Sequence, residues 1–378
     1  MLVLPADDPG LPDALAAALA GPGTGTHRGP LAPLPPEPAT TLAMLQPEQP
    51  VTEPDAALIV ATSGSTGTPK GVVLSRRALQ AGAEATHARL GGVGNWTLAV
   101  PAHYVAGIMV IARALLGGTT LFRASPDLGD LPRLASGSSS RNYLSVVPTQ
   151  LVRAMADSDL VARLARYDAI LLGGAAADPG LLDRCRSAGL RIVTTYGMSE
   201  TAGGCVYDGL PLAGVTVDLE TDGRVRIGGP VVFSGYRLRP DLTEEVLDGE
   251  RLRTRDRAEW HQAPDGPRLH VTGRIDDVVV SGGVNVDLAA VERALTAIDP
   301  QAAALGVPDP EWGTRVVAAL TVPLSLTELR AALSGLEPAA RPSGLLRHPR
   351  LPHTGSGKID RQSLIGWWTA GPAEREIL

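Results

Sequence analysis

The stretch "ATSGSTGTPKGVVLS" at residues 61–75 contains Lys70, one of only two lysines among the 34 basic residues of the chain. The other lysine, Lys358, lies in "LPHTGSGKIDRQSL" (351–364), where it follows Gly-Ser-Gly. A charge needed only for solubility could be arginine, as it is at the other 32 basic positions. We infer that both loops need a compact ammonium group, which suits phosphate oxygens.

The loop around Lys70 has the composition of a phosphate-binding segment. Glycine, serine and threonine fill "ATSGSTGTPKG", so backbone N–H groups can approach an anion and hydroxyls can add donors. The Walker A pattern does not fit, because Lys70 follows Pro69 and Gly71 stands where that pattern needs Ser or Thr for Mg²⁺. The loop also joins two apparent strands instead of a strand and a helix. For this loop alone, a Ser/Gly turn without a ligand is the alternative.

Length and composition limit the classes of protein to consider. A chain of 378 residues with 44% hydrophobic and 20% charged residues can bury a large core in two or three domains. The net charge of −6 without a basic run gives no sign of a nucleic-acid partner. We expect no signal peptide and no membrane span. Cys185 and Cys205 lack metal-type spacing, so we expect two reduced thiols in a cytoplasmic protein.

Alternating strand and helix patterns from residue 56 onward predict the fold class. The apolar runs AALIVAT, GVVLS, WTLAVP, TTLFRA, YLSVVP, AILLGGA and RIVTTYG are typical of strands, and residues 76–90, 149–167 and 179–189 have helical patterns. Ser75 is the expected N-cap of the first of these helices. The pattern predicts an α/β fold with much parallel sheet. Residues 28–56 are rich in proline, and we expect them to be extended on the surface.

The pattern changes twice toward the C-terminus. "VTVDLETDGRVRIGG" (215–229) predicts a hairpin that turns at Asp222-Gly223. After Gly273, a compact β/α pattern begins, with expected helices at 287–298 and 325–336. We therefore expect an N-terminal domain over residues 1–273 and a C-terminal domain over residues 274–378.

Four motifs in a fixed order resemble one enzyme family. They are ATSGSTGTPKG, YGMSE (196–200), GRIDD (273–277) with SGGVNV (281–286), and LPHTGSGKIDR (351–361). Together they resemble the adenylate-forming enzymes: the acyl-CoA synthetases, luciferases and peptide-synthetase adenylation domains. The resemblance covers about residues 55–370. It implies a large N-terminal α/β domain of mixed and parallel sheets with a β subdomain, and a small mobile α+β C-terminal domain.

The resemblance also implies a reaction and its cofactors. The family makes an acyl-adenylate and pyrophosphate from a carboxylic acid, ATP and Mg²⁺, and CoA then displaces AMP. Residues 86–107 and 194–215 are most similar to members that use 2-succinylbenzoate in menaquinone biosynthesis, so this acid is the expected substrate. Partners would then be small molecules, with neither nucleic acid nor membrane, and a homodimer is a further expectation.

The resemblance assigns roles to individual residues. Glu200 would hold Mg²⁺ and Lys358 would bridge the carboxylate and the α-phosphate during adenylation. His103, Tyr104 and Gly203 would lie beside the acid, although the family motif P-x-x-H-x-x-G puts His where this chain has Tyr104. The residues expected to contact nucleotide or CoA are Thr62, Ser63, Gly64, Ser65, Thr66, Gly67, Lys70, Gly174, Tyr196, Gly197, Ser199, Asp256, Arg274, Gly282 and Gly283.

Two positions depart from the family pattern. Ser199 stands where the family usually has Thr, and Arg255 replaces the Gly of the T-G-D signature. The resemblance puts Asp276 at the hinge between the domains. Asn285, expected beside CoA, could instead be a turn residue in the left-handed conformation.

Three other functions stay open. The chain could activate another aryl or short acid, or it could load a carrier protein. The absence of a carrier-like segment after residue 361 favours free CoA. A non-catalytic nucleotide-binding regulator is the third alternative, and retention of Lys70, Glu200, Asp256 and Lys358 argues against it.

Overall fold

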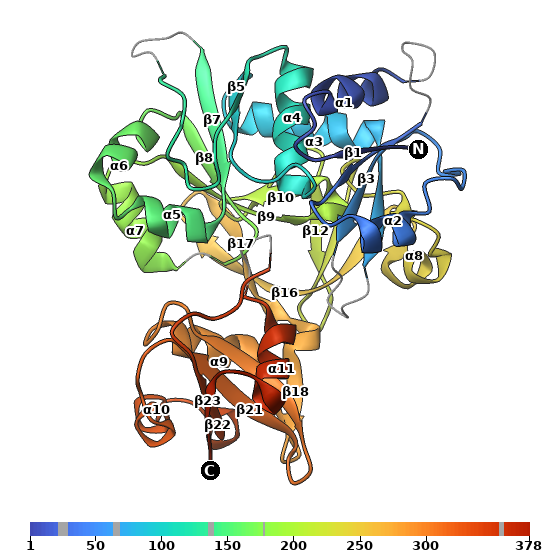
Figure 1. The fold of residues 1–378 in the computed structure, drawn as a ribbon. Coiled ribbons are helices and arrows are strands. Elements are labelled where there is room, and N and C mark those ends of the chain that lie inside the picture. Colours follow the sequence, from blue (N-terminus) through green and yellow to red (C-terminus); the bar gives the residue numbers. More distant parts are fainter. Residues whose placement is uncertain (22–28, 63–68, 135–139, 177, 355–358) are drawn as a thin grey trace. The chain divides into compact units, whose positions relative to one another are not determined.

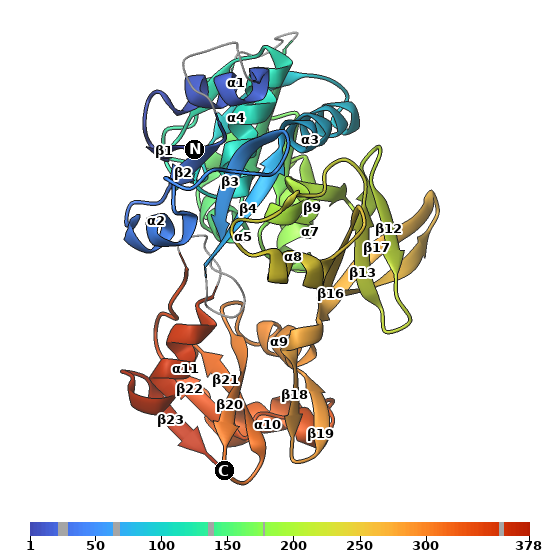
Figure 2. The same cartoon turned by 90° about the vertical axis from the view of Figure 1, so that its right-hand side faces the viewer.

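The computed structural model describes residues 1–21, 29–62, 69–134, 140–176, 178–354 and 359–378 (Figures 1 and 2). The chain forms two compact units. The larger unit comprises Met1–Asp218, Arg226–Thr254 and His261–Leu269, and the smaller comprises Leu219–Val225, Arg255–Trp260 and His270–Leu378. The domain boundary expected at 273/274 stays a prediction. No helix in the described part of the chain is long and apolar enough to cross a membrane.

The loop at 63–69 connects two strands of one sheet in the larger unit. The sheet has the order β1-β2-β3-β4-β14, with β1 at Leu2–Pro5, β2 at Leu31–Leu34, β3 at Ala56–Thr62, β4 at Lys70–Ser75 and β14 at Gly235–Tyr236. Strands β3 and β4 are antiparallel and place Thr62 opposite Lys70. The strand-to-strand connection expected from the sequence is confirmed, so the loop is not a Walker A loop.

The expectation of an extended surface segment over residues 28–56 was wrong where the chain forms a buried strand and a helix. Strand β2 is buried at all four positions, lies between β1 and β3, and is followed by helix α2 at Ala39–Leu45. Proline at position 33 lacks the N–H that a strand residue donates. This is tolerated because β2 and β3 pair only at Leu31↔Leu58, so Pro33 lies beyond the paired part of the two strands. Prolines around this strand hid its apolar character.

A second sheet of the larger unit confirms the predicted α/β architecture. Its order is β11-β10-β9-β8-β7-β5-β6, and the neighbours from β9 to β6 are parallel. Three helices, α5 (Pro148–Ala154), α6 (Ser158–Leu164) and α7 (Pro179–Ser187), pack through Leu151, Leu164 and Leu181 on one apolar cluster with strands β7 (Arg141–Val146) and β8 (Ala169–Leu172) (Figure 1). The strands are Gly94–Leu98 (β5), Leu121–Arg123 (β6), Arg141–Val146 (β7), Ala169–Leu172 (β8), Ile192–Met198 (β9), Gly203–Tyr207 (β10) and Leu210–Pro211 (β11).

The helices of this unit begin largely where the sequence predicts. The Ser75 hydroxyl accepts the Ala78 N–H at 3.0 Å and caps α3, as expected. The helical pattern at 149–167 is divided into two helices, because Asp157 accepts the N–H groups of Asp159 and Leu160 and starts a new helix. The helices are Leu11–Ala20 (α1), Arg76–Arg89 (α3), Val105–Gly117 (α4), Pro148–Ala154 (α5), Ser158–Leu164 (α6), Pro179–Ser187 (α7) and Pro240–Val246 (α8).

A third sheet contains the predicted hairpin. Its order is β12-β13-β16-β15, and β17 pairs with β16. The turn at Asp222-Gly223 is confirmed: Gly223 has φ +80 and its N–H donates to the Glu220 carbonyl at 2.9 Å. The strands are Thr216–Leu219 (β12), Arg224–Gly228 (β13), Leu247–Asp248 (β15), Arg251–Ala263 (β16) and Gly266–Arg274 (β17).

The smaller unit is built on a sheet with an apolar cluster on each face. Along β21 (Gly313–Leu320), Val316 and Ala318 join one cluster, whereas Val317 and Ala319 join the other. Helices α9 (Leu288–Thr296) and α10 (Leu326–Ala332) cover the first cluster, and α11 (Arg361–Ala370) covers the second. The other strands are Val278–Ser281 (β18), Val284–Asp287 (β19), Ala303–Asp309 (β20), Gly344–Arg347 (β22) and Glu374–Ile377 (β23).

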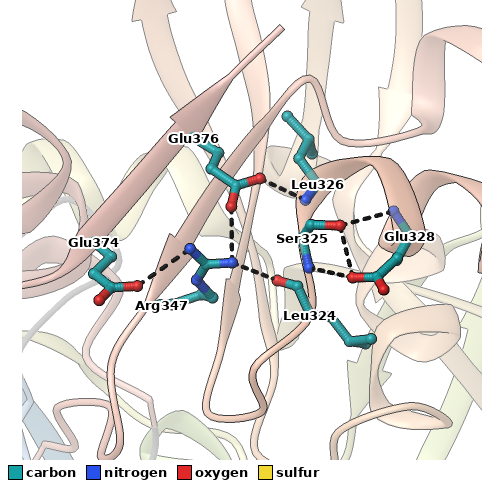
Figure 3. Close-up of polar contacts among 7 residues, drawn as sticks. All are labelled: Leu324, Ser325, Leu326, Glu328, Arg347, Glu374 and Glu376. Atoms are coloured by element: carbon teal, nitrogen blue, oxygen red, sulfur yellow. Dashed lines mark hydrogen bonds and ion pairs between the residues drawn. The ribbon is translucent and has the colours of Figure 1, made fainter.

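Ion pairs attach the last strand to this sheet (Figure 3). Arg347 on β22 pairs with Glu376 at 2.8 Å and with Glu374 at 3.1 Å, both on β23. Glu376 also accepts the Leu326 N–H at the start of α10, at 2.7 Å. The Glu376 carboxylate therefore links β22, β23 and α10.

Candidate active site

The Lys70 loop is described only at its ends. Thr62 and Lys70 face each other across the β3–β4 ladder. Lys70 is half-buried, so its side chain starts from a defined point at the beginning of β4. The expected phosphate-binding residues Ser63, Gly64, Ser65, Thr66 and Gly67 lie outside the described residues.

A tyrosine that the sequence did not single out contacts two predicted site residues. The hydroxyl of Tyr236 donates to Oε1 of Glu200 at 2.7 Å. The Nζ of Lys70 lies over the ring of the same tyrosine, 4.9 Å from its centroid. The structure thus brings Lys70 and Glu200 to one side chain, although they are far apart in the sequence. The only signal in the sequence is that aromatic residues are scarce, at 3%.

Glu200 lies in a tight turn that follows β9. Ser199–Thr201 forms a 3₁₀ turn, and the Thr201 hydroxyl donates to the Gly203 carbonyl at 2.8 Å. Ala202 and Gly203 then have positive φ values of 50 and 93. The turn explains the small residues of "YGMSETAGG" and presents Ser199 and Glu200 at the end of the strand.

The expected adenine-binding residues lie just past the carboxyl end of the parallel β8–β9 pairing, with Tyr196 still inside β9. Gly174 lies two residues beyond Leu172 of β8, and Tyr196 lies two residues beyond Thr194, the partner of Leu172 in β9. A Cβ on Gly197 would lie 2.1 Å from the Gly203 carbonyl oxygen, so only glycine fits there. Carboxyl ends of parallel strands are where open α/β sheets bind ligands, and the placement agrees with the predicted nucleotide site.

Asp256 belongs to a charged cluster in the smaller unit. Arg274 donates to Asp256 at 3.4 Å and, at 2.8 Å, to both carboxylate oxygens of Asp276. Arg255, the residue in place of the family's glycine, lies 3.6 Å from the same Asp276. Burial opposes the charged form of Asp276, but the hydrogen bonds and charge of Arg274 outweigh it and lower the pKa of that carboxyl. Two arginines therefore hold the expected hinge residue.

Gly282 and Gly283 form the turn between β18 and β19. Their φ values are +56 and +82, and a Cβ on Gly282 would lie 2.7 Å from the Trp312 ring. Asn285 pairs with Val280 in the β18–β19 ladder, so the alternative of a left-handed turn residue is wrong. The backbone conformation therefore requires glycine at this turn, independently of any contact with CoA.

His103 and Tyr104 lie side by side before helix α4. Their ring centroids are 4.1 Å apart. Burial lowers the pKa of His103 and raises the pKa of Tyr104, so both rings are held neutral at pH 7. The exchange of the two residues relative to the family keeps an imidazole and a phenol at one place.

A second residue that the sequence did not single out is a buried cation. Arg113 lies on α4 with 3% of its surface exposed, and its Nε has no hydrogen-bond partner. Its guanidinium lies over the Trp96 ring at 5.1 Å, and a Cβ on Gly203 would lie 4.0 Å from its Nη2. No carboxylate of the described residues pairs with it. The signal in the sequence was an arginine inside the apolar run "VAGIMVIARALLG".

The donors present fit a magnesium ion that arrives with a nucleotide. The described ranges contain no group of three His, Cys, Asp or Glu residues that could enclose a metal. Mg²⁺ commonly binds one or two carboxylates together with substrate phosphates and water, so Glu200 alone suffices. Lys358 lies outside the described residues, but the segment after it is fixed because Asp360 caps α11 by accepting the Ser363 N–H at 3.1 Å.

Comparisons with known proteins identify the family of the chain. The family model for AMP-binding enzymes matches residues 13–251, and the model for their C-terminal domain matches residues 290–358. The chain is 41% identical over 327 residues to the probable 2-succinylbenzoate–CoA ligase of Mycobacterium tuberculosis, covering 82% of this chain and 84% of the relative. It is 32% identical over 353 residues to the feruloyl-CoA synthase of an Amycolatopsis species, covering 83% and 70%.

A solved structure supports the same assignment. The o-succinylbenzoate CoA synthetase of Bacillus subtilis, in complex with its acyl-adenylate intermediate, matches with a TM-score of 0.68 and 26% identity over 83% of this chain and 69% of that chain. The resemblance inferred from the four motifs is confirmed. The chain belongs to the family of AMP-binding, adenylate-forming enzymes.

Proposed function

We propose that this protein is an ATP-dependent ligase that joins 2-succinylbenzoate to CoA, a step of menaquinone biosynthesis. The relatives named for this acid and the structure with its acyl-adenylate support the proposal. In the first step a carboxylate oxygen attacks the α-phosphorus and pyrophosphate leaves. In the second step the thiol sulfur of CoA attacks the acyl carbon, and AMP leaves.

The described residues divide this work between them. Lys70 would neutralise charge on the leaving pyrophosphate, and Glu200 would hold Mg²⁺, which would balance charge on the phosphates. Gly174 and Tyr196 would border the adenine. Positive charge and fixed donors are what the first step needs, because two anions must meet.

The observation that carries the choice of acid is the buried guanidinium of Arg113. 2-Succinylbenzoate has a carboxylate on its ring in addition to the one that is activated. A buried cation without a carboxylate partner in the described part of the chain is costly, and an anionic ligand would supply the partner. Arg113 is next to Gly203, an expected acid-binding residue. The ring carboxylate would therefore bind at Arg113.

An acid panel tests this proposal. With ATP, Mg²⁺ and CoA, pyrophosphate release should show a much higher kcat/KM for 2-succinylbenzoate than for benzoate, acetate, ferulate or a long-chain fatty acid. Ferulate is included because of the feruloyl-CoA synthase relative, and it lacks a second carboxylate. Equal or better turnover of any of these acids would overturn the choice of acid but leave the class of reaction intact. A cytoplasmic location and a homodimer stay predictions.

A further inference from the structure

Tyr236 is fixed in place by the backbone around it. Strand β14 pairs with β4, the strand that begins at Lys70, so that Tyr236 lies opposite Val72. The Tyr236 N–H donates to the Thr243 hydroxyl at 2.8 Å. The next residue, Arg237, is buried and donates to four backbone carbonyls, including those of Leu45 and Pro50. The ring is therefore carried by a rigid segment of the larger unit.

The turn that carries Glu200 is tied to the same segment. The Phe233 N–H donates to the Glu200 carbonyl at 2.9 Å, and the Phe233 ring meets the Tyr236 ring edge-on at 4.9 Å. With only 6% of its surface exposed, Tyr236 has little freedom to leave Glu200. Its hydroxyl donates to Oε1 of the carboxylate, which leaves Oε2 as the less occupied oxygen for a cation.

We propose that Tyr236 is a positioning residue for two groups that handle pyrophosphate: its hydroxyl orients Glu200 toward Mg²⁺ and its ring face holds the Lys70 ammonium over the phosphates. The proposal rests on the proposed function of these two residues. A hydrogen bond to a carboxylate fixes its rotamer, and a cation over an aromatic face is attracted by the ring quadrupole. The hydroxyl contact can be removed alone, because Tyr236→Phe keeps the ring that the ammonium contact needs, whereas Tyr236→Leu removes both contacts.

The test measures nucleotide binding without any acid, by calorimetry, in Mg²⁺ and in EDTA. Tyr236→Phe should weaken binding of MgATP about tenfold, the scale of one lost hydrogen bond to a charged group, and change binding of metal-free ATP less than about twofold. Tyr236→Leu should weaken both, and its effect in EDTA should match that of Lys70→Ala. In a Glu200→Gln background, Tyr236→Phe should have no further effect on MgATP.

Two control variants separate positioning from packing. Tyr167→Phe removes another buried hydroxyl, one that lies 3.0 Å from Thr97, and should leave both affinities unchanged. Phe233→Leu removes the ring packed on Tyr236 but keeps the hydroxyl contact, so it should affect MgATP less than Tyr236→Phe does. Equal losses with and without Mg²⁺ in Tyr236→Phe, or a further loss in the Glu200→Gln background, would overturn the proposal. Because no acid is present, a wrong choice of acid does not affect this result.

Discussion

The indole N–H of Trp96 donates to Nε2 of His87 at 3.4 Å in the interior of the larger unit. An accepting Nε2 requires that the imidazole be neutral, with the hydrogen on its other nitrogen. Burial, and then the charge of Arg113, lower the pKa of His87 to about 4. The native state therefore takes up a proton at this residue only near pH 4, whereas the unfolded chain does so near the ordinary value of 6.5.

Stability should consequently fall as the pH falls from 6.5 to 4. In that range the unfolded chain binds a proton that native His87 does not, so the free energy of unfolding decreases by about 1–3 kcal/mol and then levels off at this site. Urea unfolding of the parent and of His87→Gln at pH 7, 5.5 and 4.5 measures the effect. His87→Gln keeps an acceptor for Trp96 and should flatten the profile. Parallel profiles for His87→Gln and the parent would contradict this origin of the pH dependence.

The Arg347–Glu376 ion pair leads to a prediction about the stability of the smaller unit (Figure 3). Glu376→Gln should lower the free energy of unfolding of the smaller unit by about 1 kcal/mol. The reason is that the Glu376 carboxylate accepts hydrogen bonds from both Arg347 and the first N–H of α10. Amide hydrogen exchange should speed up in β22 and at Leu326. Glu374→Gln is the matched control: its side chain is 77% exposed, and an exposed pair contributes little. Equal effects of the two substitutions would show that the α10 contact adds nothing.

Lys358 lies outside the described residues, so the next prediction rests on its sequence motif alone. Lys358→Ala should reduce acid-dependent ATP–pyrophosphate exchange about a thousandfold, the scale of a lost charged contact in a transition state. The variant should still convert supplied acyl-adenylate and CoA to the thioester at nearly the parental rate. Lys358→Arg should fail as well, because a planar fork does not replace a point charge. Equal damage to both half-reactions in a folded variant would contradict a role limited to adenylation.

The sequence predicted the architecture well where patterns are local. Strand–helix alternation indicated the parallel sheet, and the cap at Ser75 and the turn at Asp222-Gly223 were both predicted correctly. Each of these signals comes from neighbouring residues, so no long-range contact was needed. Strand β2 was not predicted, because the prolines around its four buried positions obscured the apolar pattern. A single helix was predicted where Asp157 caps a second helix and so divides the pattern in two.

The candidate site was predicted only where a motif carried it. Lys70 and Glu200 stood in recognisable motifs, but Tyr236, which contacts both, is in a two-residue strand with no motif of its own. Arg113 is a single charged residue in an apolar helix. It becomes a candidate site residue only because the structure shows it buried without a carboxylate partner in the described ranges. Both depend on contacts between distant segments, which patterns along one sequence do not display.

The choice of acid depends on a match between one buried cation and one ligand carboxylate. 4-Oxo-4-phenylbutanoate has the same skeleton as 2-succinylbenzoate but lacks the ring carboxylate, so it isolates that contact. Arg113→Met removes the cation and keeps an apolar side chain. Because Arg113 has no carboxylate partner among the residues that the structure describes, the variant should unfold no more easily than the parent.

The most direct test is the ratio of kcat/KM for these two acids in the parent and in Arg113→Met. The parent should prefer 2-succinylbenzoate by about a hundredfold or more, since a site built for a polar group rejects an analogue without it. In Arg113→Met the ratio should fall below about tenfold, chiefly through loss of activity with 2-succinylbenzoate. A parent that uses both acids equally, or a folded variant with an unchanged ratio, would contradict the proposed recognition of the substrate.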